Sequence, residues 1–228
     1  MNSTLKKWGH ILSIQKISFE VHEVNQGDCI LINFRQRSQT HIITYGSIKL
    51  SKIFYNNETL TVAILTQNDF INIPNSENTI ANYYYVAEAL SFTSIISYNY
   101  TKILQKSNYC FLIYYELLSA HSRYVAKSSD MIQILSHRDK KRRLTNLLLI
   151  LSREFGTITA FGIIINLRIT HASLAEIIGS HRITVTKILN TLQGFRLISI
   201  YYNRILIHDP LSLSLHHRIL HFFYRKIY

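Results

Sequence analysis

The chain of 228 residues has a globular composition, because 47% of its residues are hydrophobic and its mean hydropathy is +0.07. This composition excludes an intrinsically disordered polypeptide. No uninterrupted apolar run is long enough to span a bilayer, and no long apolar segment follows the first residues, so the sequence predicts neither a membrane span nor a secretory signal. The chain has only two cysteines, Cys29 and Cys110, which indicates a reducing compartment and not a disulfide scaffold. Neither has a second cysteine at metal-ligand spacing, which argues against zinc.

The net charge of +12 is distributed unevenly along the chain. Residues 1–139 contain 12 basic and 10 acidic residues, a net charge of +2, whereas residues 140–228 contain 13 basic and 3 acidic residues, a net charge of +10. A uniform excess would fit a protein that is basic throughout. The segregation instead favours a near-neutral domain joined to a domain that binds a polyanion, with nucleic acid as the preferred partner.

A second bias concerns the origin of the chain. Isoleucine occurs 35 times and tyrosine 15 times, whereas proline occurs twice and glycine seven times. This usage favours residues with AT-rich codons. It predicts a location in a plastid stroma, with the cytoplasm of an AT-rich bacterium as the alternative.

In chain order, residues 17–100 have the pattern of short strands. Polar and apolar residues alternate over residues 47–53 and again over residues 59–65, with a turn signal at residues 56–58 between them, which predicts a β-hairpin. β-Branched and aromatic clusters follow at residues 82–86 and 92–98. Short strands at close spacing predict a β-barrel or jelly roll within residues 1–107.

A long helix is predicted over residues 108–137. Its apolar residues recur at spacings of three and four from Cys110 to Ile134, interrupted by Lys127. Such a stripe either packs against its own domain or forms the seam of a dimer, and we favour the dimer. The predicted seam consists of Ile113, Leu117, Ala120, Tyr124 and Met131. The charged residues 137–143 then predict a hinge between the two halves of the chain.

Residues 138–228 contain a pattern of two short helices joined by a tight turn. A helix over residues 144–155 precedes it and ends at Gly156, a C-cap signal, and residues 162–167 are predicted to be a β-segment. Thr170 and Ser180 are predicted to cap the two helices, with Gly179 in the turn between them. Ala175 is the small residue expected where the helices cross, and the residues expected to face inward are Leu174, Ile178, Val185 and Ile188.

This pattern is either an ordinary helical hairpin or a helix-turn-helix, and the basic surroundings favour DNA binding. Arg182 is expected to read guanine and Lys187 to reach a base edge or a phosphate. Thr170, His171 and Ser180 lie near helix N-termini and are expected to contact phosphate groups. A hairpin over residues 198–207 is predicted to form a wing. The predicted DNA-binding residues are Thr170, His171, Ser180, His181, Arg182, Thr184, Thr186, Lys187 and Arg204.

The segments 147–156 (LLLILSREFG) and 179–189 (GSHRITVTKIL) resemble the Crp/Fnr family, and in particular its branch of global nitrogen regulators. Segments 135–139 (LSHRD) and 46–52 (GSIKLSK) match as well, so the resemblance covers roughly residues 40–210. It implies an α+β fold: a β-barrel (jelly roll) like those that bind cyclic nucleotides, a long dimerisation helix and a C-terminal winged helix-turn-helix. It also implies a homodimer on a GTA…TAC palindrome of double-stranded DNA, and the apolar Ile183 suits the nitrogen branch.

The chain departs from the family where other members bind an effector. Residues 70–75 lack the expected glycine turn, and tyrosines at 83–85 occupy the place of an arginine. Tyr124 and Ser129 stand where the family has arginine and glutamate, although Arg123 is adjacent. Because a dicarboxylate needs a paired cation, we expect no cofactor. Retained binding of 2-oxoglutarate is the alternative, and binding of cyclic AMP is less favoured still.

The sequence therefore predicts a transcription regulator that is not an enzyme, since no catalytic pair and no glycine-rich phosphate loop stands out. The alternative is an effector-independent architectural or polymerase-recruiting protein of the same fold, with RNA polymerase as a further partner. Scattered histidines, among them His216, His217 and His221, are expected to be solvated or close to DNA.

Overall fold

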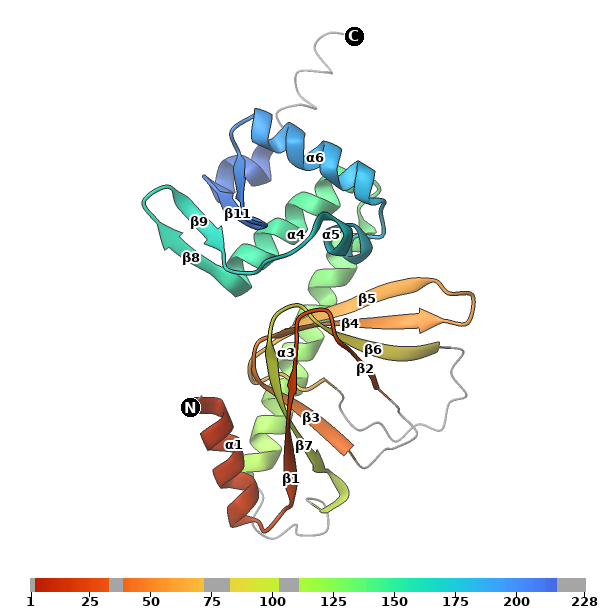
Figure 1. The fold of residues 1–228 in the computed structure, drawn as a ribbon, viewed down its shortest axis with the longest axis vertical. Coiled ribbons are helices and arrows are strands. Elements are labelled where there is room, and N and C mark those ends of the chain that lie inside the picture. Colours follow the sequence, from red (N-terminus) through yellow and green to blue (C-terminus); the bar gives the residue numbers. More distant parts are fainter. Residues whose placement is uncertain (1–2, 33–38, 72–82, 103–110, 217–228) are drawn as a thin grey trace. The chain divides into compact units, whose positions relative to one another are not determined.

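The computed structural model describes residues 3–32, 39–71, 83–102 and 111–216 (Figure 1). The chain divides into two compact units, Met1–Met131 and Ile132–Tyr228. The division falls inside the long helix α3 (Phe111–Ser136), whereas the sequence placed a domain boundary after residue 137. Among the described helices, none is both long and apolar enough to cross a membrane.

The first unit is built on two antiparallel sheets. One has the order β1-β7-β3 and the other the order β2-β6-β4-β5. The fold class expected for the N-terminal part, a barrel or jelly roll of short strands, agrees with this arrangement. The strands are β1 (Phe19–Val24), β2 (Cys29–Ile32), β3 (Gln39–Tyr45), β4 (Ser47–Phe54), β5 (Thr59–Thr66), β6 (Tyr83–Ala89) and β7 (Thr93–Asn99).

The hairpin of β4 and β5 confirms the prediction from alternating residues. Ile48 pairs with Leu65 and Lys52 with Leu60 in its register. Gly46 precedes β4 with a φ of +91°, and a Cβ added there would lie 2.4 Å from the Phe92 carbonyl oxygen. Both the backbone conformation and the close approach therefore require glycine.

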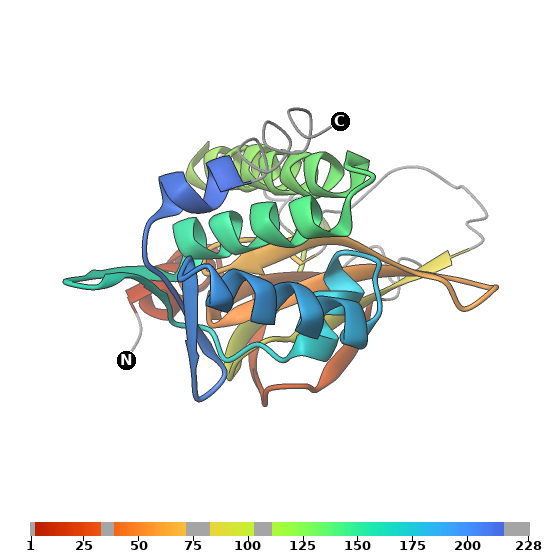
Figure 2. The ribbon, with the colours of Figure 1, turned by 90° about the horizontal axis from the view of Figure 1, so that it is seen from above.

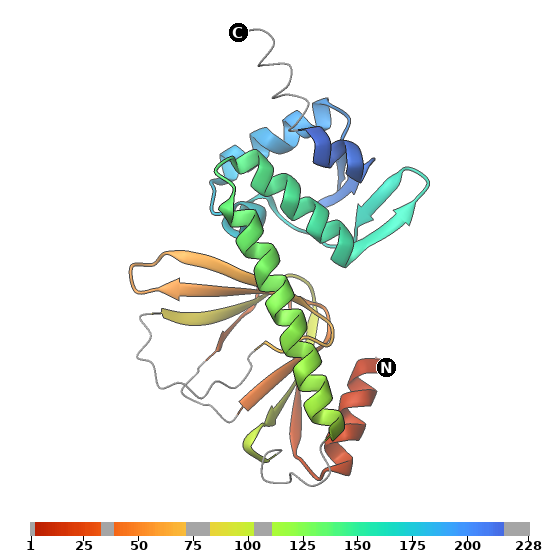
Figure 3. The same ribbon diagram turned by 180° about the vertical axis from the view of Figure 1, so that it is seen from behind.

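Helix α1 (Ser3–Ile14) was not predicted from the sequence. It buries Trp8 and Leu12 completely, and Trp8 packs edge-on against Phe70 at a centroid distance of 5.6 Å. Figure 3 shows α1 beside the first turns of α3. The two helices thus share one apolar core with the strands.

Helix α3 exists as predicted, but the stripe chosen as a dimer seam faces the protein's own core. Ile113 and Ala120 are each 1% exposed and belong to the same cluster as Trp8, with Leu117 packed against it. Tyr124 packs against the second core cluster, which lies between the sheets. Met131 is 3% exposed. The prediction that this stripe holds two chains together was therefore wrong for Ile113, Leu117, Ala120 and Tyr124, because the core of their own chain already covers them. Cys110 lies outside the described residues.

The second unit combines helices with a four-stranded antiparallel sheet of order β10-β11-β9-β8. Helix α6 lies beside α4 and β10 (Figure 2). Leu144, Leu147, Leu148 and Leu151 of α4 are fully buried and form the centre of this unit. The elements are α4 (Lys140–Phe155), β8 (Gly156–Thr159), β9 (Gly162–Ile165), α5 (His171–Ile177), α6 (Arg182–Gly194), β10 (Ile198–Tyr201) and β11 (Arg204–Ile207).

Gly156 follows α4 as predicted, but its backbone is extended, with φ −79° and ψ 141°. It is not a left-handed cap. A Cβ at this position would lie 2.0 Å from the Ser152 carbonyl oxygen, so glycine is needed for space. The chain continues directly into β8, a strand that sequence reasoning missed.

His216 is buried, whereas the sequence analysis expected it to be solvated or close to DNA. Its Nε2 lies 3.0 Å from Nζ of Lys141, and its ring is 4.7 Å from that of Phe195. Burial lowers the pKa of His216, and the Lys141 ammonium lowers it further. His217 and His221 fall outside the part of the chain that the structure describes.

Candidate nucleic-acid interface

Helix α5 begins at His171, directly after Thr170, the cap residue that the sequence predicted. The Thr170 side chain accepts a hydrogen bond from the Ser173 amide over 3.1 Å, and its backbone is extended, as expected of an N-cap residue. Leu174 and Ile178 are fully buried, and Ala175 is 3% exposed at the crossing with α6. The local prediction for this helix is confirmed.

The turn after α5 depends on Gly179. Its φ is +62°, a left-handed conformation that glycine adopts at little cost. A Cβ there would meet only Nη1 of Arg143, at 3.6 Å, which is an ordinary contact. Backbone conformation is therefore the reason for this glycine. The Ser180 amide then donates to the Ala175 carbonyl over 2.8 Å and closes the turn.

The second helix begins one residue later than predicted. His181 is the N-cap residue of α6, and it makes no side-chain capping bond. Ser180 lies in the turn, where its hydroxyl is buried without a hydrogen-bond partner among the described residues. The prediction that Ser180 caps this helix was wrong, because the turn uses both Gly179 and Ser180.

The buried face of α6 also differs in one position from the prediction. Val185, Leu189 and Leu192 are fully buried, at the spacing of one helix face, whereas Ile188 is only partly buried. Leu189, and not Ile188, is therefore the inward residue that follows Val185. In the N-terminal half of α6, Arg182, Ile183 and Lys187 are exposed.

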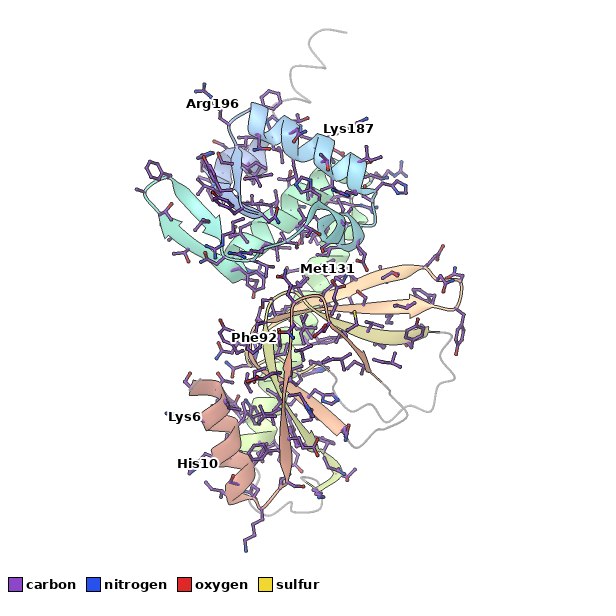
Figure 4. All side chains as sticks on the ribbon, in the orientation of Figure 1. Lys6, His10, Phe92, Met131, Lys187 and Arg196 are labelled. Carbon is purple, nitrogen blue, oxygen red and sulfur yellow. The ribbon has the colours of Figure 1, made fainter. Side chains whose placement is uncertain are left out.

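The outward face of α6 is basic at its N-terminal half. His181, Arg182, Ile183 and Lys187 are exposed, with Ile183 71% exposed. Figure 4 shows the Lys187 side chain pointing away from the helix. Guanidinium and ammonium groups on a helix of this kind can reach guanine and phosphate groups in a major groove.

Two of the predicted contact residues are engaged with each other. Oγ1 of Thr186 lies 2.9 Å from Nδ1 of His171 and donates to the Arg182 carbonyl over 3.0 Å. Thr184 and Thr186 are partly buried. This pair links the start of α5 to the first turns of α6, so it fixes the angle at which α6 is presented.

The wing forms as predicted. Tyr202 and Asn203 connect β10 to β11 with φ values of 47° and 62°, the signs of a type I′ turn. The Ile169 amide donates to the Asn203 carbonyl over 3.3 Å, so the tip of the wing lies beside the segment that precedes α5. Arg204 is exposed there, together with Thr170.

This arrangement adds two residues that sequence reasoning missed. Arg168 is exposed next to the wing tip, and Tyr202 is 94% exposed at the tip itself. A positive φ is uncommon at a tyrosine, and here the two-residue wing turn requires it. The only signal in the sequence was the position of Arg168 two residues before the Thr170 cap.

The outer side of α3 carries an apolar stripe that the sequence analysis did not select. Tyr115, Leu118, Val125 and Ile132 are 61%, 70%, 52% and 69% exposed. Exposed Ser122 and Ser129 fall between them, so the stripe has alternating spacings of three and four residues. This is the heptad spacing of a helix that packs against a second helix.

The cations of α3 are occupied by a buried carboxylate. Arg123 donates from Nε to Oδ1 of Asp69 over 3.1 Å and from Nη2 to the Asn68 carbonyl over 2.6 Å. Lys127 donates to Oδ2 of the same Asp69 over 2.5 Å. Tyr124 is half-buried, and burial raises the pKa of its hydroxyl.

Lys52 is the cation next to the tyrosines of β6. Its Nζ lies 4.4 Å from the centroid of the Tyr83 ring and 5.3 Å from that of Tyr85. Burial also raises the pKa of Tyr85. Residues 72–75, part of the segment that lacks the glycine turn of the family, lie outside the described residues. Among the residues that the structure describes, no group of three metal-ligating side chains occurs.

Comparison with known proteins identifies the class of this chain. Residues 142–214 match the model of the Crp-like helix-turn-helix domain. The chain is 32% identical over 218 residues to the HTH-type transcriptional regulator ycf28 of Porphyra purpurea. The alignment covers 93% of this chain and 88% of that one. It is also 32% identical over 177 residues to the global nitrogen regulator of a Nostoc species, covering 77% and 79% of the two chains.

The fold agrees with these relationships. A Crp-family transcriptional regulator of Thermus thermophilus superposes with a TM-score of 0.68 at 16% identity, covering 85% of this chain and 94% of that one. The protein is thus a transcription regulator with a helix-turn-helix DNA-binding domain. It belongs to the Crp/Fnr family.

Proposed function

We propose that this chain is a homodimeric, sequence-specific regulator of nitrogen-related genes that binds a palindromic DNA site through α6. The exposed N-terminal half of α6 carries this proposal, because Arg182, Ile183 and Lys187 are the outward residues of the helix that follows the Gly179 turn. Similarity to global nitrogen regulators supports the choice of target genes. Arg182 is suited to a bidentate contact with guanine, and the exposed Ile183 to the methyl group of thymine.

We further propose that two chains associate through the outer stripe of α3, formed by Tyr115, Leu118, Val125 and Ile132. These side chains are exposed in the single chain, and large exposed apolar surfaces commonly mark interaction sites. Two copies of such a helix can pack in the manner of a parallel coiled coil. A two-fold dimer would then place two copies of α6 at half-sites about one helical turn, roughly 34 Å, apart.

The remaining basic and aromatic residues fit contacts with the DNA backbone. Arg168 and Arg204 lie on either side of the hydrogen bond that joins Ile169 to the wing, and Tyr202 is at its tip. Backbone contacts set the register of the protein on the duplex and do not select sequence. Both arginines would contribute to the salt dependence of binding.

We propose that binding does not depend on 2-oxoglutarate, since Arg123 and Lys127 are already held by Asp69. A plastid location stays a prediction from composition. Recruitment of RNA polymerase is a second candidate function, favoured by the hairpin of β8 and β9, where Ile158 and Phe161 are 84% and 77% exposed.

The test is a selection of DNA fragments bound by the full chain from a random pool at fixed salt. We expect enrichment of a palindrome of the GTA…TAC type. Recovery of fragments without any common palindrome would reject sequence-specific regulation and leave the architectural alternative.

A further inference from the structure

Arg143 connects three elements of the second unit. It lies in the first turn of α4 and donates from Nε to the His137 carbonyl over 2.7 Å and from Nη1 to the Ile178 carbonyl over 3.0 Å. His137 directly follows the last residue of α3, and Ile178 is the C-cap residue of α5. One guanidinium therefore joins the end of the long helix to the turn of the helix-turn-helix.

Both acceptors are carbonyl groups at helix C-termini. Such groups have no partner within their own helix, so they depend on donors from elsewhere. A charged donor makes a stronger hydrogen bond than a neutral one, and the guanidinium group holds its N–H donors in a rigid, planar fork. Arg143 thus supplies a donor to both carbonyl groups. Because the fork is rigid, the angle between the two acceptors can vary only a little.

The corner between α3 and α4 has further hydrogen bonds around Arg143. Oδ1 of Asp139 accepts from the Lys141 amide over 2.9 Å and caps α4. Nδ2 of Asn146 lies 2.9 Å from Nε2 of His137. In the structure these hydrogen bonds bridge the charged junction, which stays a predicted hinge.

The turn held by Arg143 leads directly into α6. Ile178 is fully buried, Gly179 follows with its left-handed backbone, and α6 begins at Arg182. A displacement of the Ile178 carbonyl would therefore move the first turn of α6. Arg182 and Ile183, both proposed to contact bases, lie in that turn.

We infer that Arg143 is a positioning residue that sets the spacing of DNA half-sites accepted by the dimer. The inference rests on the proposed function, because it needs two chains joined through α3. In such a dimer the end of α3 is the reference point for each α6. Arg143 fixes the position of the turn relative to that reference, so it fixes how far apart, and in what rotation, the two helices meet the duplex.

The experiment measures the affinity of the full chain for palindromes whose half-sites are moved closer or farther by one and two base pairs, at fixed salt. A shift of one base pair rotates a half-site by roughly a tenth of a turn. We expect wild-type protein to lose at least about tenfold in affinity per base pair, a difference of about 1.4 kcal/mol. For Arg143→Gln, the loss of affinity per base pair, measured relative to the best site of that variant, should be less than about threefold.

Two further variants make the test specific. Arg142→Gln removes the same charge at the neighbouring position and should keep the narrow profile. Arg143→Lys keeps the charge but replaces the rigid fork with a single ammonium group, and it should broaden the profile. Thermal unfolding of each variant shows whether it is folded.

A folded Arg143→Gln protein with the wild-type profile would overturn the inference. If Arg143→Gln does not fold, the Lys variant decides, and a wild-type profile there would equally overturn it. Wild-type protein that binds palindromes of all spacings equally would instead contradict the proposed dimer on a palindrome. That result is separate from a failure of Arg143 to act.

Discussion

Lys127 of α3 donates to Oδ2 of Asp69 over 2.5 Å, and this ion pair explains why a lysine interrupts an apolar stripe of the helix. The side chains of Lys127 and Asp69 are 11% and 2% exposed. Arg123, one turn earlier, meets the other oxygen of the same carboxylate. The side of α3 that carries Lys127 therefore faces the protein's own strands.

The first prediction concerns this buried carboxylate. Asp69→Asn should reduce the free energy of unfolding by roughly 3–5 kcal/mol, because it leaves the buried Lys127 ammonium without its counter-charge. Urea unfolding is the measurement. The double variant Asp69→Asn with Lys127→Met should regain part of this stability, since it removes the unpaired charge. A loss below about 1 kcal/mol for Asp69→Asn would show that the pair is not a buried one in solution.

The second prediction separates the two stripes of α3. Leu118→Asp should give a folded monomer with weak DNA binding, because it places a charge in the exposed stripe proposed as the dimer interface. Leu117→Asp is the matched control. It places the same charge against the core that contains Trp8, so it should unfold the first unit. Sedimentation velocity and thermal unfolding distinguish them, and a stable dimer of Leu118→Asp would exclude this interface.

The third prediction concerns base reading by α6. Arg182→Ala should cost on the order of 1–3 kcal/mol on the specific site and relax the preference at one base pair of each half-site. Arg196→Ala, an exposed arginine beyond the other end of α6 (Figure 4), removes the same charge and should leave the preference intact. Selection of bound fragments measures both. An unchanged profile for Arg182→Ala would move base reading to another residue.

The fourth prediction concerns pH. Burial and the adjacent Lys141 ammonium keep the pKa of His216 below its ordinary value of about 6.5. The unfolded chain therefore takes up a proton at higher pH than the folded chain does, so stability is present above pH 6.5 and is lost as the pH falls below it. His216→Gln keeps an acceptor for Lys141 and cannot titrate.

The measurement is thermal unfolding from about pH 7.5 to about pH 5.5, a range that brackets the ordinary histidine pKa. The decrease in melting temperature should be smaller for His216→Gln than for wild-type protein. His10→Gln, at an exposed position of α1, should follow wild-type protein. Identical curves for His216→Gln and wild type would show that the contact with Lys141 does not form in solution. His41 also has a pKa lowered by burial, so a residual slope is expected.

The fifth prediction concerns the effector. Millimolar 2-oxoglutarate should change DNA affinity less than tenfold, a coupling below about 1.4 kcal/mol. A dicarboxylate that pairs with Arg123 or Lys127 would have to displace Asp69 from them. A binding titration at fixed salt, with and without the effector, is required, since salt alone shifts affinity by orders of magnitude. A change well above tenfold would contradict the proposal that binding does not depend on 2-oxoglutarate.

Local signals were sufficient for much of the DNA-binding unit. The Thr170 cap, the left-handed Gly179 and the wing turn at residues 202–203 each depend on neighbouring residues, so the sequence predicts them well. Within the helix-turn-helix itself the errors were of one residue: the cap moved from Ser180 to His181, and the buried position from Ile188 to Leu189. One-residue shifts of this kind depend on packing against α4 and α5, which the local pattern does not contain.

The long helix shows what only the tertiary structure decided. Its sequence carries two apolar stripes, both with spacings of three and four, and both are typical of a packed face. Periodicity establishes the helix, but it cannot rank two stripes of the same period. The choice was made by α1, which the sequence analysis did not predict, and by the carboxylate of Asp69. Trp8 and Leu12 cover Ile113 and Ala120, and Asp69 holds Lys127. The stripe of Leu118 is the one left exposed, because no surface among the described residues covers it.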